Sequence, residues 1–204
     1  MAVTREVARK RAAKEFAKKW AGRGYEKGDT ASFWLELLRD VVGMEDVTTS
    51  VRFEKATNER GFIDVTIRDA KTVVEQKSLG VDLDRPELRQ GMEVTPYRQA
   101  KRYADSLRNS ERPDTIIVCN FDEFRIHDLD SEYAEQDYVQ FRLAELPDQL
   151  HLLDFLVDPQ RERQRREEKV SLDAGSLIGK LYEMLREQYL DPDSAESRCT
   201  DHGG

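Results

Sequence analysis

Two short apolar runs, residues 61–68 and 72–78, carry charged side chains that could perform chemistry. Both runs are rich in the β-branched residues typical of strands, and the segment Arg68–Lys71 that joins them is short enough for a tight hairpin turn. Asp64 lies in the first run, and Glu75, Gln76 and Lys77 lie in the second. Because side chains alternate between the faces of a strand, Glu75 and Lys77 are predicted to share one face while Gln76 points away.

A turn with Asp69 and Ala70 as its two loop residues would place Asp64 directly opposite Glu75. Cross-strand partners have Cβ atoms about 5 Å apart, so the two carboxylates would repel unless a cation lay between them. Mg²⁺, or Mn²⁺ in its place, suits this position because it prefers oxygen ligands and accepts carboxylates together with a substrate phosphate. Lys77 would orient or deprotonate a water, or stabilise charge on the phosphorane. The pattern predicts metal-dependent phosphodiester hydrolysis; the alternative is a surface hairpin with an ordinary ion pair.

A polar pair further along the chain points to the same site. Gln99 and Tyr103 are four residues apart on a helix predicted for residues 95–107, so they project from one face. They could hydrogen-bond to the catalytic groups or to a substrate phosphate. The alternative is that Tyr103 belongs to the core and Gln99 is a surface amide.

The remaining pattern describes the elements that must position these side chains. Three strands, a helix and further strands in this order indicate an α/β fold with a central mixed sheet flanked by helices. Residues 78–94 show no clear period and are predicted to form a long loop. The other predicted elements are a basic amphipathic helix before Gly22, helices at 30–42 and 147–156, and strands at 51–54, 115–120, 123–129 and 138–143.

The order of these elements, with Asp64, Glu75-Gln76-Lys77 and the Gln99/Tyr103 pair, resembles the PD-(D/E)xK nuclease core. More narrowly, the segments FIDVTI, VVEQKSLGVDLD, QAKRYADSL and IIVCNFDEFRIHDL, within residues 30–190, are similar to the N-terminal nuclease domain of MmeI-like type IIL (type IIG) restriction–modification enzymes.

That resemblance implies a set of roles. Asp64, Glu75 and Lys77 would be catalytic, and Asp64, Glu75 and the main-chain carbonyl of Gln76 would hold the metal. Glu36 would match an accessory acid on the first core helix. Ile63 stands where the family name has proline. No adenine-methyltransferase motif is present, so S-adenosylmethionine would bind only in a methyltransferase part of a parent protein.

Four segments are expected along the chain. Residues 1–29 would form the basic N-terminal helix, 30–157 the nuclease core, 158–190 the start of a helical connector, and 191–204 a disordered tail.

The distribution of charge along the chain indicates a binding partner. The 204 residues carry a formal net charge of −8, but residues 1–27 contain nine basic and three acidic residues. Double-stranded DNA is the expected partner, with Arg9, Lys14 and Lys18 as candidate phosphate contacts; the alternative is a solvated basic face.

No apolar run is long enough for a membrane span and no signal core is evident, so a cytoplasmic location is expected. Dimerisation is expected if both strands are cut.

Two other functions remain open. One is the nuclease domain of a type I restriction motor subunit, which carries a similar core. The other is a catalytically inactive nuclease-like domain for DNA binding or assembly. Other chemistries find little support, because the chain has no P-loop or nucleophile elbow and its two cysteines cannot hold an iron–sulfur cluster.

Overall fold

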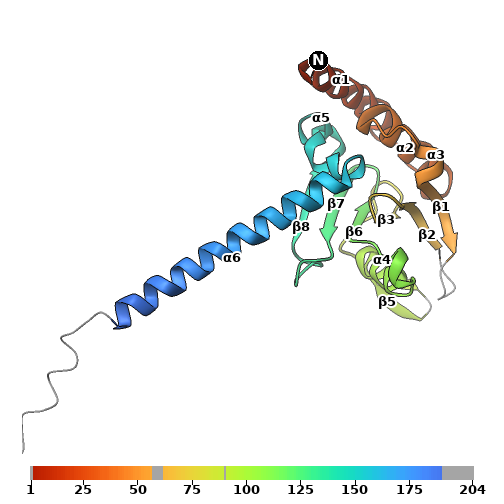
Figure 1. Cartoon of the computed structure of the whole chain (residues 1–204). Helices are drawn as coiled ribbons and strands as arrows, with labels where there is room; N and C mark the ends of the chain where they lie inside the picture. The colour runs from red at the N-terminus through yellow and green to blue at the C-terminus, as the bar shows by residue number, and fades with distance from the viewer. Residues whose placement is uncertain (1, 57–61, 90, 190–204) are drawn as a thin grey trace, which may run out of the picture. The chain divides into compact units, whose positions relative to one another are not determined.

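The computed structural model describes residues 2–56, 62–89 and 91–189. The chain divides into two compact units, residues 1–159 and 160–204. The first unit holds the sheet and the helices that cover it, including the N-terminal helix (Figure 1). The second is formed by a single long helix, α6 (Pro159–Tyr189), as far as the structure describes it. The predicted tail at 191–204 lies outside the described residues.

A six-stranded mixed sheet forms the centre of the first unit, as the sequence predicts. Its strands follow the order β1-β2-β3-β6-β7-β8, and only the central β3–β6 pair is parallel. Both central strands are buried along their whole length, which explains their continuous apolar character. The strands are β1 (Val51–Ala56), β2 (Phe62–Ile67), β3 (Thr72–Gln76), β6 (Thr115–Cys119), β7 (Glu123–Asp128) and β8 (Tyr138–Arg142).

One face of the sheet is covered by the N-terminal helices. Helix α1 (Ala2–Trp20), helix α2 (Glu26–Glu36) and the π-helical segment η1 (Leu37–Val42) contribute the aromatic and aliphatic side chains of the larger core cluster. The π-helix ends at Gly43, whose φ of 87° is readily adopted only by glycine. The sheet side of this cluster includes Val65, Val74, Ile117, Cys119 and Phe124.

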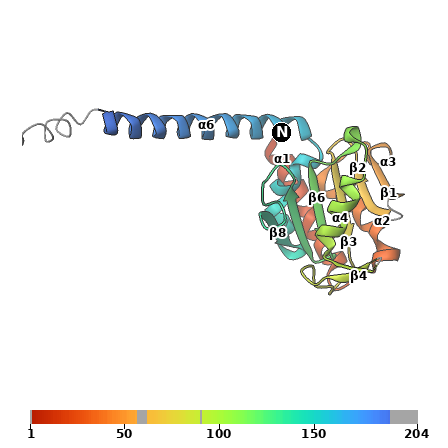
Figure 2. The same cartoon turned by 90° about the horizontal axis from the view of Figure 1, so that it is seen from below.

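Helix α4 (Pro96–Asp105) covers the opposite face of the sheet (Figure 2). Thr95 caps the helix by accepting a hydrogen bond from the amide of Arg98, and Pro96 occupies the first turn. Tyr97, Ala100, Tyr103 and Leu107 pack there against Val73, Ile116 and Val118 of the central strands. The molecule therefore has two distinct sheet faces, and the site depends on which face each residue occupies.

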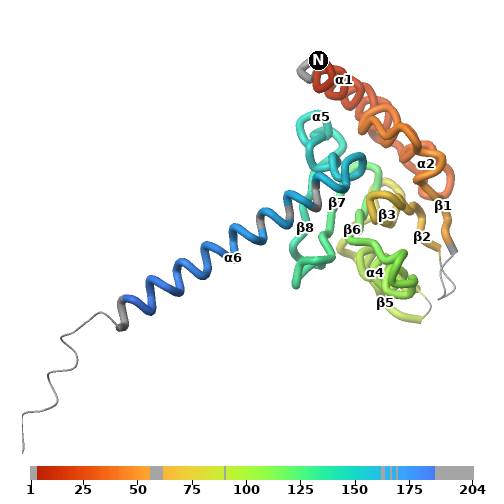
Figure 3. The backbone as a smooth tube through the Cα atoms, viewed as in Figure 1, coloured from red at the N-terminus to blue at the C-terminus, as the bar shows by residue number. Residues whose placement is uncertain are grey.

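The structure corrects several predicted boundaries. The first core helix begins at Glu26, four residues before the predicted start. The sequence did not indicate this start, because the preceding residue, Tyr25, forms no side-chain capping hydrogen bond. The predicted loop at 78–94 contains a two-stranded hairpin, β4 (Glu87–Arg89) and β5 (Met92–Val94), before the chain enters α4 (Figure 3). The remaining short elements are α3 (Val47–Ser50), η2 (Asn109–Glu111), η3 (Leu143–Glu145), α5 (Leu146–Gln149) and η4 (Leu150–Leu156). None of the described helices is long and apolar enough to cross a membrane.

Candidate active site

The β2–β3 hairpin has the predicted register. Val65 pairs with Val74 and Ile67 with Thr72, and the amide of Lys71 donates to the carbonyl of Arg68 to close the turn. The next pair in this register would be Asp64 and Glu75. Instead of continuing the ladder, Asp64 Oδ2 accepts a hydrogen bond of 2.7 Å from the amide of Gln76. The sheet therefore opens at the level of the two carboxylates.

The neighbouring β1–β2 ladder is irregular at the same level. Phe53 pairs with Val65 and Lys55 with Ile63, but Glu54, which would face Asp64, has a φ of 51°. A left-handed backbone costs a non-glycine residue about 1–2 kcal/mol. Such outliers are frequent at functional sites, and this one lies beside the proposed metal-binding carboxylate.

Glu75, Lys77 and Gln99 form a buried polar cluster on the α4 face. Lys77 Nζ donates to Glu75 Oε1 over 2.6 Å and contacts Gln99 Oε1 at 3.3 Å. Glu75 is 2% exposed and Lys77 is 1% exposed. The strand end holds Lys77 in place, because its amide donates to the carbonyl of Cys119 on β6 over 2.7 Å. The structure thus brings together three of the polar residues that the sequence singled out.

The side chain and the main chain of Gln76 make separate contacts. Its side chain points to the α1–α2 face, where its Oε1 accepts a hydrogen bond of 2.7 Å from Trp34 Nε1. Its amide points toward β2 and Asp64. Because the N–H and C=O of one strand residue point to the same neighbouring strand, the Gln76 carbonyl also points toward β2. It does so beyond Val65, where the β2–β3 ladder has ended.

Burial raises the pKa values of both carboxylates. It raises the pKa of Asp64 to about 6, although the hydrogen bond from Gln76 and the charge of Lys77 oppose the change. It raises the pKa of Glu75 to about 8, and the negative charge of Asp64 adds to this effect. Burial alone would lower the pKa of Lys77, but the adjacent Glu75 outweighs it and the pKa is raised. Lys77 therefore stays charged, and a nearby cation would stabilise the ionised forms of both carboxylates.

The donor set fits a hard divalent cation. Asp64 Oδ1 and Glu75 Oε2 have no hydrogen-bond partner among the described residues. The Gln76 carbonyl points toward β2 at the level where the β2–β3 ladder has ended. Two carboxylates and a carbonyl are ligands that Mg²⁺ accepts together with waters and a phosphate. No group of three or more His, Cys, Asp or Glu side chains able to hold a metal occurs in the described parts of the chain. The fit therefore depends on the carbonyl and on non-protein ligands.

Gln99 and Tyr103 have different surroundings. Gln99 reaches Lys77 from the first turn of α4. Tyr103, one turn later, is 8% exposed and packs in the core cluster beneath the helix. Of the two readings open for Tyr103, the structure favours the core residue.

Glu36, the expected accessory acid, and Glu26, which the sequence did not indicate, lie at opposite ends of α2. Glu36 Oε2 accepts hydrogen bonds from Lys19 Nζ at 2.6 Å and Trp20 Nε1 at 3.2 Å, so it joins α2 to α1. Glu26 begins α2, about 15 Å before Glu36 along the helix axis, and its amide donates to Ser78 Oγ directly after Lys77. Its charge raises the pKa values of Asp64, Glu75 and Lys77. Sequence reasoning missed Glu26, because only the tertiary contact between residues 26 and 78 brings it to the site.

Arg89 is a second charge that the sequence did not indicate. It lies on β4, within the predicted loop, and pairs with Glu87 at 2.7 Å. Its positive charge lowers the pKa values of Asp64 and Lys77. No periodic signal in residues 78–94 could have revealed it.

The candidate phosphate contacts of α1 lie on the other side of the sheet. Helix α1 packs in the cluster that contains Val74 and Phe124, whereas Glu75 and Lys77 face α4. Arg9 is already bound to Asp154 at 2.8 Å. Lys14 and Lys18 are exposed. A duplex bound at Glu75 and Lys77 would therefore approach the face opposite α1 (Figure 2).

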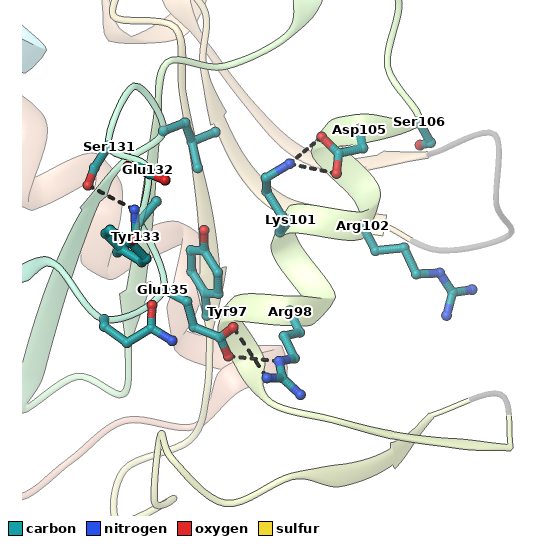
Figure 4. Close-up of a pocket in the computed structure, with 13 residues that line it drawn as sticks. Tyr97, Arg98, Lys101, Arg102, Asp105, Ser106, Ser131, Glu132, Tyr133 and Glu135 are labelled. Atoms are coloured by element: carbon teal, nitrogen blue, oxygen red, sulfur yellow. Dashed lines mark hydrogen bonds and ion pairs between the residues drawn. The ribbon is translucent and has the colours of Figure 1, made fainter.

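A groove of about 630 Å³ lies between α4 and the segment that joins β7 to β8 (Figure 4). Its charges neutralise one another: Arg98 pairs with Glu135 at 2.7 Å and Lys101 with Asp105 at 2.5 Å. None of the five proposed site residues Asp64, Glu75, Gln76, Lys77 and Gln99 lines it. The groove therefore lacks the chemistry of the polar cluster.

Comparison with known families decides the relationship of the chain. The family model described as "MmeI, N-terminal domain" matches residues 11–188. The chain belongs to the MmeI N-terminal domain family. The α/β architecture with a central six-stranded mixed sheet agrees with the PD-(D/E)xK-like core expected of this family. No curated protein matches the chain. No solved structure matches it either. The MmeI N-terminal family indicates a domain of a restriction–modification enzyme.

Proposed function

We propose that this MmeI N-terminal domain is a divalent-metal-dependent DNA endonuclease. One observation carries the proposal: the opening of the β2–β3 ladder leaves Asp64 and Glu75 side by side in the register, with Lys77 2.6 Å from Glu75. A buried and a partly buried carboxylate beside a buried lysine are costly for a fold unless they bind something. The family match to a restriction-enzyme domain supplies the substrate class.

Each residue has a role in the proposal. Asp64, Glu75 and the carbonyl of Gln76 would hold Mg²⁺ or Mn²⁺, which when bound supplies a Lewis acid and lowers the pKa of a coordinated water. Lys77 would orient the attacking water or stabilise charge on the phosphorane. Gln99, at 3.3 Å from Lys77 Nζ, would fix the position of the ammonium group.

The wider organisation follows from the family. Helix α6 would begin the connector toward a methyltransferase, the part of a parent protein where S-adenosylmethionine would bind. The family match favours this reading over a type I motor subunit. Cutting both strands of a duplex would involve two copies, and the location would be the cytoplasm, where such enzymes meet DNA.

The test is cleavage of supercoiled plasmid in Mg²⁺ or Mn²⁺. The unmodified chain should nick or linearise the plasmid, and Asp64→Asn, Glu75→Gln and Lys77→Ala should each slow it about 100-fold or more. Lys10→Ala is the matched control, because Lys10 is an exposed lysine on the opposite face, paired with Asp148 at 3.8 Å. Equal cleavage by Lys77→Ala and the unmodified chain would contradict the proposal. A folded chain that binds DNA but neither binds metal nor cuts would indicate the inactive assembly domain instead.

A further inference from the structure

A second groove, of about 590 Å³, lies at the β1 edge of the sheet. Its floor is formed by β1, β2 and β3, and its far wall by Ser110, Glu111 and Pro113, which follow α4 in the chain. Thr66 and Val73 pair on the floor, and Val73 packs in the cluster beneath α4. The groove is therefore on the same face of the sheet as Glu75 and Lys77.

The groove is strongly basic in an acidic chain. Four basic residues line it, Arg52, Lys55, Arg68 and Lys71, against the single acid Glu111. Lys55 pairs with Glu111 at 3.2 Å, and Lys71 pairs with Asp114 at 3.6 Å.

Two of these cations are uncompensated. Arg52 and Arg68 are exposed and form no ion pair within the described residues. On the floor between them, the Thr66 hydroxyl has no hydrogen-bond partner among the described residues. The groove thus offers two arginines that form no ion pair within the described residues, unlike the groove beside α4, where Arg98 and Lys101 pair with acidic residues.

The strand register relates the groove to the proposed metal site. Thr66 follows Asp64 by two residues on the same face of β2, and Arg52 is the cross-strand partner of Thr66. At about 3.3 Å per strand residue, Arg52 lies level with a point about 7 Å from Asp64, and Arg68 lies about 13 Å from it. Phosphates of one DNA strand advance about 3.4 Å each along the helix axis. Arg52 and Arg68 therefore lie about two and about four phosphate steps from Asp64.

We propose that this groove binds the sugar–phosphate backbone of duplex DNA on one side of the scissile phosphate. The inference rests on the proposed nuclease function, which supplies the substrate. Guanidinium and ammonium groups contact phosphates without reading bases, so binding would be independent of sequence and sensitive to salt. The proposal moves the DNA contact from Lys14 and Lys18 of α1 to the face that carries the cluster.

The test is binding of a fluorescent 30-base-pair duplex in EDTA, where no cleavage interferes. The double variant Arg52→Gln/Arg68→Gln should weaken binding about 10-fold and reduce the slope of log K against log salt by about 2, because each lost phosphate contact removes about 0.9. Lys14→Gln/Lys18→Gln removes the same charge from the other face and should change neither quantity. Both pairs of side chains are exposed, so the variants should fold, which thermal melting checks.

Three results would overturn the inference. They are undiminished binding by the groove variant, equal weakening by the α1 variant, or no binding of the duplex by the unmodified chain at low salt. The outcome is separable from that of the cleavage test. If the chain binds DNA through the groove but does not cut it, the groove proposal stands and the nuclease proposal fails. If the chain still cuts and binds DNA after its groove charges are neutralised, the nuclease proposal stands and the groove proposal fails.

Discussion

Lys77 Nζ donates to Glu75 Oε1 over 2.6 Å, and both side chains are almost fully buried. The cost of removing two charges from water can exceed the energy of their attraction, so such a pair is poor evidence for a stabilising role. Burial also raises the pKa of Glu75 to about 8 despite the lysine beside it. A bound divalent cation would lower the pKa of Glu75 and offset the repulsion from Asp64. The raised pKa of this buried pair therefore supports the proposed metal site.

Replacement of Lys77 should separate function from folding. In Lys77→Met, Glu75 loses its positive neighbour, and its already raised pKa rises further, so that it stays neutral near pH 7. The buried unpaired charge is thereby avoided, and we expect unfolding free energy to fall by less than the roughly 3–5 kcal/mol typical of a broken buried pair. Plasmid cleavage should fall about 100-fold or more. Denaturant unfolding and cleavage measured on one preparation check both parts; retained cleavage, or failure to fold, would contradict them.

Metal affinity should increase with pH. The raised pKa values of Asp64, about 6, and Glu75, about 8, mean that a cation must displace protons below these values. We expect Mn²⁺ affinity to rise steadily from pH 6 to pH 8.5, by up to about tenfold per unit for each proton displaced. Calorimetric titration in buffers of different ionisation enthalpy measures both the affinity and the protons released. An affinity independent of pH over this range would be inconsistent with the buried carboxylates as ligands.

Stability in the presence of a chelator should depend on pH in the opposite direction. A carboxyl whose pKa is higher in the folded state binds more protons when folded, so its contribution favours low pH and is lost as pH rises. For Glu75 this window runs from about 4.5, its ordinary value, to about 8. The melting temperature of the unmodified chain in EDTA should therefore decrease across this window. In Glu75→Gln the decrease should be smaller, and an equal decrease would contradict the assigned pKa.

Gly24 should be the least replaceable glycine near the site. Its φ is 148°, and an added Cβ would lie 2.2 Å from the ring of Phe121, which is fully buried. Its carbonyl also accepts a hydrogen bond from the amide of Leu79, two residues after Lys77. We expect Gly24→Ala to lower the unfolding free energy by at least about 1–3 kcal/mol, because overpacking forces the ring or backbone to move.

Gly28→Ala provides the comparison for Gly24. Gly28 lies in helix α2, and an added Cβ would meet only the exposed ring of Tyr25 at 3.3 Å. Alanine is favoured over glycine within helices by about 1 kcal/mol, so this change should be neutral or stabilising. Urea unfolding of both variants decides the matter, and similar effects at the two positions would refute the packing argument.

The sequence predicted the hairpin and its register well, for a physical reason. Alternating β-branched residues defined the strands, and the short turn left few choices of pairing, so the register that aligns Val65 with Val74, next to Asp64 and Glu75, followed from counting. The β4–β5 hairpin escaped prediction because its three-residue strands lack a recognisable period.

The features that the sequence did not predict depend on tertiary packing. Tyr25 gives no capping signal for α2, so the sequence predicts that the helix begins at residue 30 and leaves Glu26 outside it. The placement of α1 on the face opposite the cluster depends on which strand residues its aromatic side chains meet, including Val74 and Phe124. No local pattern in the sequence contains that information.

The central claim is that Asp64 and Glu75 hold a divalent cation, and Mn²⁺ titration at pH 8.5 tests it most directly. We expect the unmodified chain to bind one Mn²⁺, and Asp64→Asn and Glu75→Gln each to weaken binding about 10-fold or more. Asp40→Asn, which alters an exposed aspartate paired with Arg39 at 2.6 Å, should bind as the unmodified chain does. Failure of the unmodified chain to bind Mn²⁺ at millimolar concentration, or binding that neither carboxylate substitution changes, would contradict the account.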